Sequence, residues 1–316
     1  MWRGQSVTVI LPTYNEKDSI RASTLDFFAT GLADEVIVVN NNAAPGTSRE
    51  LAGTGAREVF ETKQGYGHAL LCGIDHCRAD LVVLAEPDGT FSGHDLLKFL
   101  AYSDDVPVVF GTRTTREFIW TGANMGRFLR WGNWAVAKMT EVLFGTSILT
   151  DMGCTYRLFR RTAIERIRPH LKIGGSHFGP QLLMEVIAHR IPFVEIPVNY
   201  RSRVGVSSVT GDLWKAAWVG LRMIALVLGY RLGGFRSARI MWDRAEKPAT
   251  PFASPGVHAL QQALSNDADR SFEDRPLAAR TGPARPSKLP EARAGSAEPG
   301  SVVRASVSKV SQGKKL

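Results

Sequence analysis

The sequence predicts an α/β protein with a mostly parallel sheet and helices on both of its faces. Two observations predict this class. From Val7 to Phe110, short runs rich in β-branched residues alternate with longer segments of helical spacing, and this alternation is typical of parallel strands joined by right-handed crossovers. The run from Leu81 to Ala85 is entirely apolar, which indicates a central strand that is buried on both faces.

The first part of the chain, up to Gly111, holds most of the expected sheet. Strands are expected at residues 7–11, 35–39, 58–60, 81–85 and 106–110, and helices at about 15–28, 47–51, 69–78 and 95–102. Pro12 is expected to stop the first strand. Asn15 or Asp18 is expected to cap the helix that follows it.

Beyond Gly111 the spacing changes. Helices are expected at 127–144, 163–167 and 181–189, an irregular and then strand-like segment at 151–159, and a strand at 193–200. Pro197 lies within that last strand, which indicates an edge position. The glycine-rich segment 174–180 is expected to form a mobile loop. Seven apolar residues of 127–144 are expected to face the core, with an exposed apolar face as the alternative. They are Phe128, Trp131, Trp134, Ala135, Met139, Val142 and Leu143.

The C-terminal third contains a tryptophan-rich amphipathic segment, residues 213–230. Lys215 and Arg222 interrupt its apolar run, so the segment is too short to span a bilayer, which takes about 20 apolar residues. Its basic, Trp-bearing character predicts a helix on an anionic membrane surface, the alternative being a terminal helix packed on the domain. Residues 245–316 are rich in Pro, Ala, Ser and Gly and predict a disordered tail. The expected organisation is a domain at 1–210, with halves at 1–111 and 112–210, an amphipathic segment at 211–244, and the tail.

Composition limits the partners. The 316 residues carry a formal net charge of +9, which favours an anionic partner such as a nucleotide, an acidic lipid or a nucleic acid. Nucleic acid is not expected, because no aromatic sheet motif or recognition-helix pattern is present. Three cysteines without a metal-ligand pattern, Cys72, Cys77 and Cys154, suit a reducing compartment. The N-terminus lacks a signal-peptide pattern, so a cytoplasmic location is expected.

Two carboxylates follow the apolar run at 81–85. Glu86-Pro87-Asp88 stands just past the carboxyl end of this strand, where open α/β sheets place their ligands. Carboxylate oxygens suit a hard divalent cation, and Mg²⁺ commonly shares itself with substrate phosphates. The sequence therefore predicts a metal–diphosphate site, with an ordinary acidic turn as the alternative.

Five motifs in order carry a resemblance to a known family. They are Leu11-Pro12-Thr13-Tyr14-Asn15-Glu16, Lys63-Gln64-Gly65-Tyr66-Gly67-His68-Ala69, Glu86-Pro87-Asp88, Phe110-Gly111-Thr112-Arg113, and Asp151-Met152-Gly153-Cys154-Thr155-Tyr156-Arg157. Over about residues 6 to 210 the chain resembles the family 2 glycosyltransferases of the GT-A fold, and among them the dolichyl- or polyprenyl-phosphate mannosyltransferases. The resemblance implies a Rossmann-like fold and an inverting, metal-dependent transfer of a hexose from a GDP-mannose or UDP-glucose type donor.

The resemblance also implies roles for individual residues. Glu86 and Asp88 would hold Mg²⁺ or Mn²⁺, with Glu86 in place of the usual first aspartate. Asn40 and Asn41 stand where the family often has two aspartates. The donor site would comprise Pro12, Tyr14, Glu16, Asn40, Asn41, Lys63, Glu86, Pro87 and Asp88. Residues expected to meet the acceptor or its phosphate are Arg113, Arg130, Arg157, Arg201, Arg203 and Ser207, because guanidinium groups suit phosphate oxygens.

The nature of the acceptor depends on the need for a base. A sugar hydroxyl loses a proton as it attacks and needs a positioned carboxylate, for which Asp151 is the best candidate and Glu185 a weaker one. A polyprenyl phosphate is already anionic and needs none. We therefore expect a polyprenyl-phosphate acceptor and an enzyme peripheral to the cytoplasmic face of the membrane. The alternatives are transfer to a sugar or protein hydroxyl in glycan synthesis, and a nucleotide-binding relative without catalysis.

Overall fold

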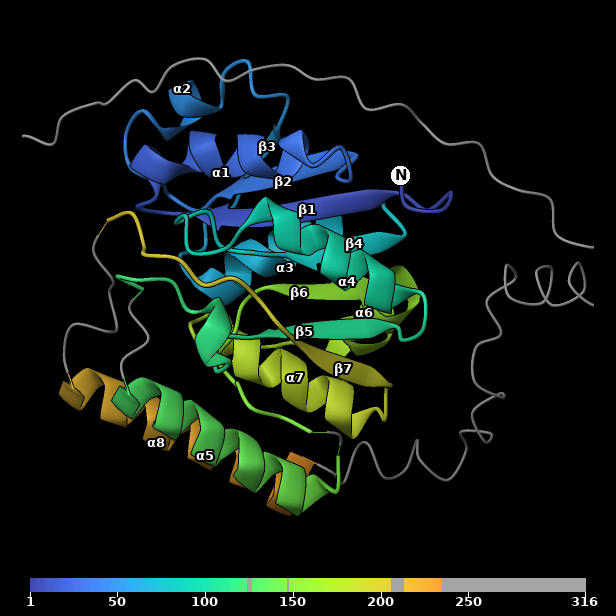
Figure 1. Cartoon of the computed structure of the whole chain (residues 1–316), viewed down its shortest axis with the longest axis vertical. Helices are drawn as coiled ribbons and strands as arrows, with labels where there is room; N and C mark the ends of the chain where they lie inside the picture. Colours follow the sequence, from blue (N-terminus) through green and yellow to red (C-terminus); the bar gives the residue numbers. More distant parts are fainter. Residues whose placement is uncertain (124–126, 147, 206–212, 235–316) are drawn as a thin grey trace, which may run out of the picture. The chain divides into compact units, whose positions relative to one another are not determined.

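A seven-stranded mixed sheet forms the centre of the computed structural model, which describes residues 1–123, 127–146, 148–205 and 213–234. The strand order is β3-β2-β1-β4-β6-β5-β7 (Figure 1). The strands are β1 (Val7–Thr13), β2 (Glu35–Asn40), β3 (Arg57–Phe60), β4 (Leu81–Leu84), β5 (Val108–Thr112), β6 (Arg157–Arg160) and β7 (Phe193–Pro197). β6 runs antiparallel to both of its neighbours, and the remaining pairs are parallel. The predicted α/β class and the edge position of β7 are confirmed.

The connections between strands are mainly helical. The α-helices are α1 (Lys17–Ala29), α2 (Thr47–Leu51), α3 (Tyr66–His76), α4 (Leu96–Ser103), α5 (Arg127–Phe144), α6 (Arg161–Ile167), α7 (Phe178–Ala188) and α8 (Leu213–Gly229). Shorter turns of 3₁₀-helix are η1 (Gly93–Asp95), η2 (Arg116–Phe118) and η3 (Arg168–His170), and η4 (Tyr230–Gly234) is a π-helical turn.

Each face of the sheet carries its own hydrophobic core. Side chains along a strand alternate between faces, so Val9 and Leu11 of β1 join the core under α1 and α4, whereas Ile10 joins the core under α3, α6 and α7. Phe99 of α4 is fully buried in the first core, and Phe178 of α7 is fully buried in the second. Coverage on both faces explains why β4 is wholly apolar, as the sequence predicts.

Three local expectations need correction. The cap of α1 is Glu16 rather than Asn15 or Asp18, and Glu16 Oε2 accepts hydrogen bonds from the backbone N–H groups of Tyr14 and Asn15. α3 begins three residues earlier than expected, at Tyr66, after a turn at Gly65 with a φ of 146°. α7 begins at Phe178, inside the expected loop. Pro180 is compatible with this start because it lies in the first turn of the helix, where a backbone nitrogen needs no hydrogen-bond partner.

The expectation for the apolar residues of α5 is also wrong in part. Trp131 and Trp134 are 60% and 41% exposed, and Val142 is 81% exposed. Met139 and Leu143 pack against the core as expected, beside the buried Val136 and Ala137, and the side chain of Phe128 lies outside the described part of the structure. The reason is position, because α5 packs beside α8 at the periphery of the sheet (Figure 1) and only one of its sides meets the core.

α8 shows the same division between a packed side and an outer side. Met223 and Val227 are buried in the core, while Leu221 and Leu228 are 58% and 39% exposed. No helix in the described part of the chain combines the length and apolar character that crossing a bilayer requires. The expected disordered tail lies outside the described residues.

Candidate active site

The candidate site lies where the parallel strands end. β1, β2, β4 and β5 all have their carboxyl ends at one edge of the sheet, and the segment before β6 enters at the same edge. Glu86 and Asp88 follow β4 directly. Gly89 then turns the chain with a φ of 81°. A Cβ at this position would also lie 3.3 Å from a methyl group of Val204, so the tight turn favours glycine for two reasons.

The guanidinium group of Arg203 forms ion pairs with both carboxylates of this turn, Glu86 and Asp88. Asp88 is 1% exposed, and its Oδ1 accepts hydrogen bonds from the N–H (2.9 Å) and Oγ1 (2.5 Å) of Thr90. A guanidinium nitrogen of Arg203 lies 2.5 Å from Asp88 Oδ2 and 3.1 Å from Glu86 Oε2. Burial and the neighbouring Asp88 raise the pKa of Glu86 to about 7. A cationic group therefore already stabilises the pair, and these carboxylate oxygens suit Mg²⁺ or Mn²⁺.

The segment that carries Arg201 and Arg203 is attached to the acidic turn through its backbone. The N–H of Arg201 donates to the carbonyl of Thr90 at 2.9 Å, and the N–H of Val204 donates to the carbonyl of Asp88 at 2.9 Å. Arg201 also lies over the ring of Trp120, 5.0 Å from its centroid. The side chain of Arg203 thus reaches Glu86 from 117 positions away, and that of Arg201 donates to the hydroxyl of Ser92 from 109 positions away.

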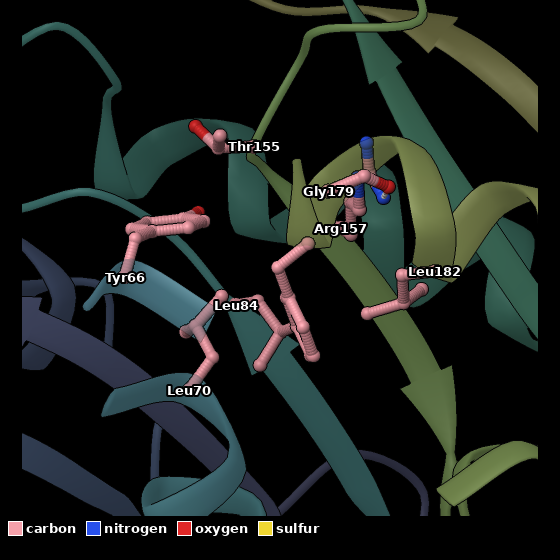
Figure 2. A pocket seen from close by; sticks show the side chains of 8 residues that line it. Tyr66, Leu70, Leu84, Thr155, Arg157, Gly179 and Leu182 are labelled. Carbon is pink, nitrogen blue, oxygen red and sulfur yellow. Dashed lines mark hydrogen bonds between the residues drawn. The ribbon is translucent and has the colours of Figure 1, made fainter. Parts of the chain in front are cut away.

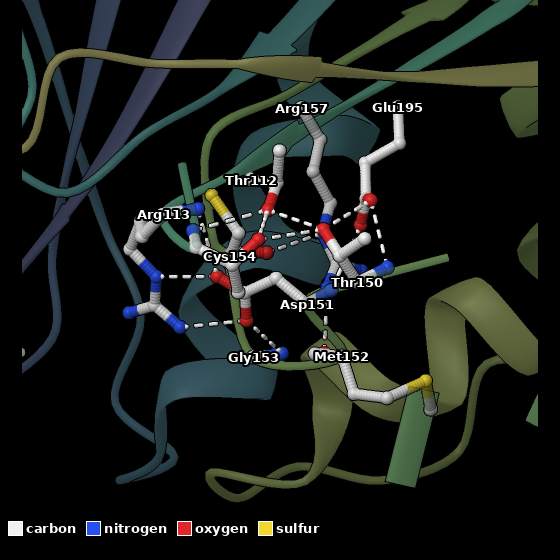
Figure 3. A network of polar contacts seen from close by, with 10 residues as sticks. Thr112, Arg113, Thr150, Asp151, Met152, Gly153, Cys154, Arg157 and Glu195 are labelled. Carbon is white, nitrogen blue, oxygen red and sulfur yellow. Dashed lines mark hydrogen bonds and ion pairs between the residues drawn. The ribbon is translucent and has the colours of Figure 1, made fainter. Parts of the chain in front are cut away.

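Asp151 lies in a buried network with a different arginine (Figure 3). Arg113 makes a two-pronged contact with it, from Nε to Oδ2 at 2.8 Å and from a terminal nitrogen to Oδ1 at 3.0 Å. Burial on its own would raise the pKa of Asp151, but Arg113 outweighs burial and the pKa is lowered. The expected base is therefore held as a carboxylate in an ion pair.

Glu195 of β7 is a part of this network that the sequence analysis did not single out. Its Oε2 accepts from the N–H and Oγ1 of Thr150, at 2.7 and 2.6 Å, and its Oε1 accepts from the N–H of Asp151 at 3.0 Å. Burial raises the pKa of Glu195 to about 7. An acidic residue between apolar neighbours in a predicted strand was the signal in the sequence that could have indicated this contact.

The expected donor residues surround the ends of β1 and β2. Asn41 is buried and binds the loop at 61–65, donating to the carbonyls of Glu61 and Lys63 and accepting from the N–H of Gly65. Asn40 donates to Glu58 at 2.8 Å. The amide groups of both asparagines therefore shape the loops at this edge.

The other expected donor residues differ in exposure. Tyr14 is 48% exposed and Lys63 is exposed, whereas Pro12 and Pro87 are buried. Glu16 stabilises the turn after β1, as described above.

Arg157 lies inside the fold, on the wall of a small pocket (Figure 2). It is 2% exposed and donates to the carbonyl oxygens of Cys154, Gly179 and Met152. The rest of the pocket is mostly apolar and is lined by Tyr66, Leu70, Leu84, Thr155, Phe178, Gly179 and Leu182. These contacts join β6 to α7, so in this structure Arg157 stabilises the fold.

The remaining predicted residues lie elsewhere. Arg130 is half-buried in α5, and Ser207 lies outside the described residues. Glu185 is buried in α7, where it accepts a hydrogen bond from Tyr230.

Comparisons with known proteins agree with this geometry. The family described as Glycosyl transferase family 2 matches residues 8–168. A low-salt glycan biosynthesis hexosyltransferase of Haloferax volcanii is 26% identical over 218 residues, and the alignment spans 66% of this chain but only 52% of that relative. A dolichyl-phosphate hexose transferase of the same organism is 29% identical over 230 residues, which cover 72% of this chain and 96% of the relative.

A solved structure shows the same fold. Glucosyl-3-phosphoglycerate synthase from Mycobacterium tuberculosis, in complex with Mn²⁺, UDP and glucosyl-3-phosphoglycerate, matches with a TM-score of 0.55 and 18% identity, over 73% of this chain and 81% of that one. The family match begins in β1, includes the acidic turn and ends beyond β6. The chain therefore belongs to glycosyl transferase family 2.

Proposed function

We propose that this glycosyltransferase moves a hexose from a GDP- or UDP-sugar to a polyprenyl phosphate, with inversion and with Mg²⁺ or Mn²⁺. The observation that carries the proposal is the turn Glu86-Pro87-Asp88, in which the half-buried Glu86 and the buried Asp88 already bind a guanidinium group. The similarity to a dolichyl-phosphate hexose transferase supports a lipid-phosphate acceptor. The complex of the solved relative with Mn²⁺ and UDP supports a metal and a nucleotide donor.

Residues at the sheet edge have complementary roles in this reaction. A divalent cation held by Glu86 and Asp88 would supply charge neutralisation at the leaving diphosphate. A cation held by these carboxylates would displace Arg203, whose guanidinium would then be available to bind phosphate oxygens. Arg201, stacked on Trp120, offers a second positive charge beside it. Holding both substrates in line supplies much of the remaining rate enhancement.

The state of Asp151 favours a phosphate acceptor over a hydroxyl acceptor. A general base must accept a proton from the nucleophile, but Asp151 is paired with Arg113 and its pKa is lowered. A polyprenyl phosphate is an anion that attacks without first losing a proton. An acceptor that needs no general base therefore agrees with the ion pair in which Asp151 is held.

We further propose that the enzyme works on an anionic membrane surface, at its cytoplasmic face. Apolar side chains are exposed on α5 and α8, including Trp131 and Trp134 on the first and Leu221 on the second. Arg222 and Arg231 are exposed along α8 and its π-helical end. Basic helices with exposed tryptophans bind anionic interfaces. The three cysteines are buried and free, which suits a reducing compartment.

The proposal can be tested by transfer from labelled donors to a short polyprenyl phosphate. We expect the full chain to transfer label from GDP-mannose, UDP-glucose or a related donor in the presence of Mg²⁺ or Mn²⁺, and a chelator to stop it. Asp88→Asn should slow transfer by about a hundredfold or more, because a carboxylate is lost at the developing charge. Asp105→Asn changes an exposed aspartate in the turn before β5 and serves as the control.

Two results would contradict the proposal. The first is transfer that a chelator leaves unchanged, and the second is near wild-type turnover by a folded Asp88→Asn variant. Transfer to sugar or protein hydroxyls but not to polyprenyl phosphate would support the hydroxyl-acceptor alternative.

A further inference from the structure

A second cluster of potential metal ligands lies apart from the acidic turn. One ring nitrogen from each of His170 and His189 and one carboxylate oxygen of Glu185 all lie within 4.8 Å of one another. His170 belongs to η3, and Glu185 and His189 are one turn apart on α7. α7 runs from the carboxyl edge of the sheet, where Gly179 contacts Arg157, toward the start of β7. The cluster is therefore near the opposite edge of the sheet from Glu86 and Asp88.

The cluster is largely withdrawn from water. Glu185 and His189 are 7% and 8% exposed, and His170 is half-buried. The rings of the two histidines lie 4.7 Å apart. A buried carboxylate needs a compensating partner, and the two imidazoles with the carboxylate supply three convergent ligands for a cation.

Hydrogen bonds around the cluster orient its members. The Nδ1 of His189 lies 2.9 Å from the carbonyl oxygen of Glu185. Since a carbonyl only accepts, Nδ1 carries the proton and Nε2 keeps a free lone pair in the neutral ring. Glu185 in turn accepts a hydrogen bond from the hydroxyl of Tyr230. Such outer contacts are typical of ligands held ready for a metal.

We propose that His170, Glu185 and His189 form a second metal site, separate from the transfer site, which binds Zn²⁺. Two imidazoles and one carboxylate suit Zn²⁺, whereas Mg²⁺ prefers oxygen ligands alone. Water can complete the coordination because His170 is half-buried. A bound ion would attach η3 to α7, and it would connect α7 to the end of α8 through Glu185 and Tyr230. The proposed role is structural, and it does not depend on the identity of either substrate.

Zinc binding to the full chain tests the proposal without an activity assay. The protein is first stripped with a chelator and then titrated calorimetrically with Zn²⁺ in saturating Mg²⁺, which occupies the acidic turn. We expect one Zn²⁺ site, and we expect its affinity to fall by about tenfold or more in His170→Ala, because one ligand is lost. His170 is half-buried, so this variant should fold. His94→Ala removes an exposed histidine of η1 and should bind Zn²⁺ as the wild type does.

Cobalt substitution gives a second readout on the wild-type chain. Co²⁺ bound by two imidazoles and a carboxylate in a four- or five-coordinate site should give visible d–d absorption that Zn²⁺ displaces. The spectrum should persist in Asp88→Asn and be lost in His170→Ala. Equal Zn²⁺ affinity of His170→Ala and wild type would overturn the proposal, as would an unaltered Co²⁺ spectrum in His170→Ala or a Zn²⁺ site that Asp88→Asn abolishes.

Discussion

At the residue scale, Arg203 occupies the place of a cation in the acidic turn. Its guanidinium lies 2.5 Å from Asp88 and 3.1 Å from Glu86, so a metal ion bound there would compete with Arg203 for the same oxygens. Such a competition would couple metal binding to the position of the segment that also carries Arg201. Removal of the metal should therefore return Arg203 to the carboxylates rather than leave them unpaired.

Arg203→Gln should tighten Mn²⁺ binding and slow transfer. Loss of a competing ion pair worth about 1 kcal/mol corresponds to roughly a fivefold lower Kd for Mn²⁺. Transfer should fall because a phosphate-binding guanidinium is lost. Electron paramagnetic resonance of free Mn²⁺ measures the affinity directly. Arg116→Gln, at an exposed arginine of η2, is the control. Unchanged Mn²⁺ affinity in Arg203→Gln would refute the competition.

For Asp151, a structural role and a role as general base predict different effects of substitution on stability and on turnover. Asp151→Asn should lower the free energy of unfolding by about 3–5 kcal/mol, because it leaves the buried guanidinium of Arg113 without its partner. In the wild type, the pKa of Asp151 is lowered by folding. The carboxylate therefore stabilises the folded state at pH values above its unfolded-state pKa of about 4, and this stabilisation is lost as the pH falls through its folded-state pKa. Urea unfolding measures the change. A variant that keeps its stability but loses turnover would indicate a base.

At the element scale, α5 and α8 together present the apolar side chains that the core does not use. Trp131 and Trp134 meet edge to face, with ring centroids 5.5 Å apart, while Val136 and Val227 face the core from α5 and α8. The same two helices thus serve two surfaces, one packed and one exposed. This division is typical of an element that attaches a domain to an interface.

The double variant Trp131→Ala/Trp134→Ala should float less with anionic vesicles at low salt, because two interfacial side chains are removed. Its melting temperature should change little, since Trp131 and Trp134 are 60% and 41% exposed and neither belongs to the buried core. Leu97→Ala/Tyr102→Ala provides a matched control, because both residues are about half exposed on α4, which covers the other face of the sheet. Equal flotation of the Trp131/Trp134 variant and the wild type would exclude α5 from membrane contact.

At the scale of the whole molecule, Glu195 connects the edge strand β7 to the segment that precedes β6. Its folded-state pKa of about 7 lies above the ordinary value of 4.5. The folded protein therefore holds a proton that the unfolded chain has released between these values. Since stability falls with pH wherever the folded state binds more protons, Glu195 makes the protein less stable as pH rises from 4.5 to 7.

Glu195→Gln should flatten this pH dependence. Between pH 4.5 and 7, ionisation of Glu195 should lower the free energy of unfolding of the wild type by up to about 3 kcal/mol. Each unit of difference between the folded and unfolded pKa values contributes about 1.4 kcal/mol. Urea titrations at several pH values measure the slope for both proteins. The absolute stability of the variant is expected to be lower, since an amide replaces an acceptor of three hydrogen bonds. The same slope in both proteins would remove Glu195 as its source.

Much of this fold can be predicted from local patterns. The bounds of α2 and α5 match the expected ranges, and Leu81–Leu84 is the expected central strand, because apolar periodicity reports how each short segment is buried. The order of the motifs also indicates the family, and Glu86-Pro87-Asp88 lies at the sheet edge as expected. The sequence alone thus determined the order and approximate places of the strands and helices, the class of enzyme and the position of the carboxylates.

Only the tertiary structure decided which charged groups meet. Arg203 reaches Glu86 across 117 positions, and Arg113 reaches Asp151 across 38, whereas Arg157 lies against backbone carbonyls. It also decided that Trp131 faces outward on α5. These choices depend on which segments the sheet brings side by side, and periodicity along one segment contains no information about its distant partner. The burial of a short segment can be inferred from the pattern of its own residues. The partner of a charged group and the exposed side of a helix depend instead on segments that are distant in the sequence and meet only in the folded protein.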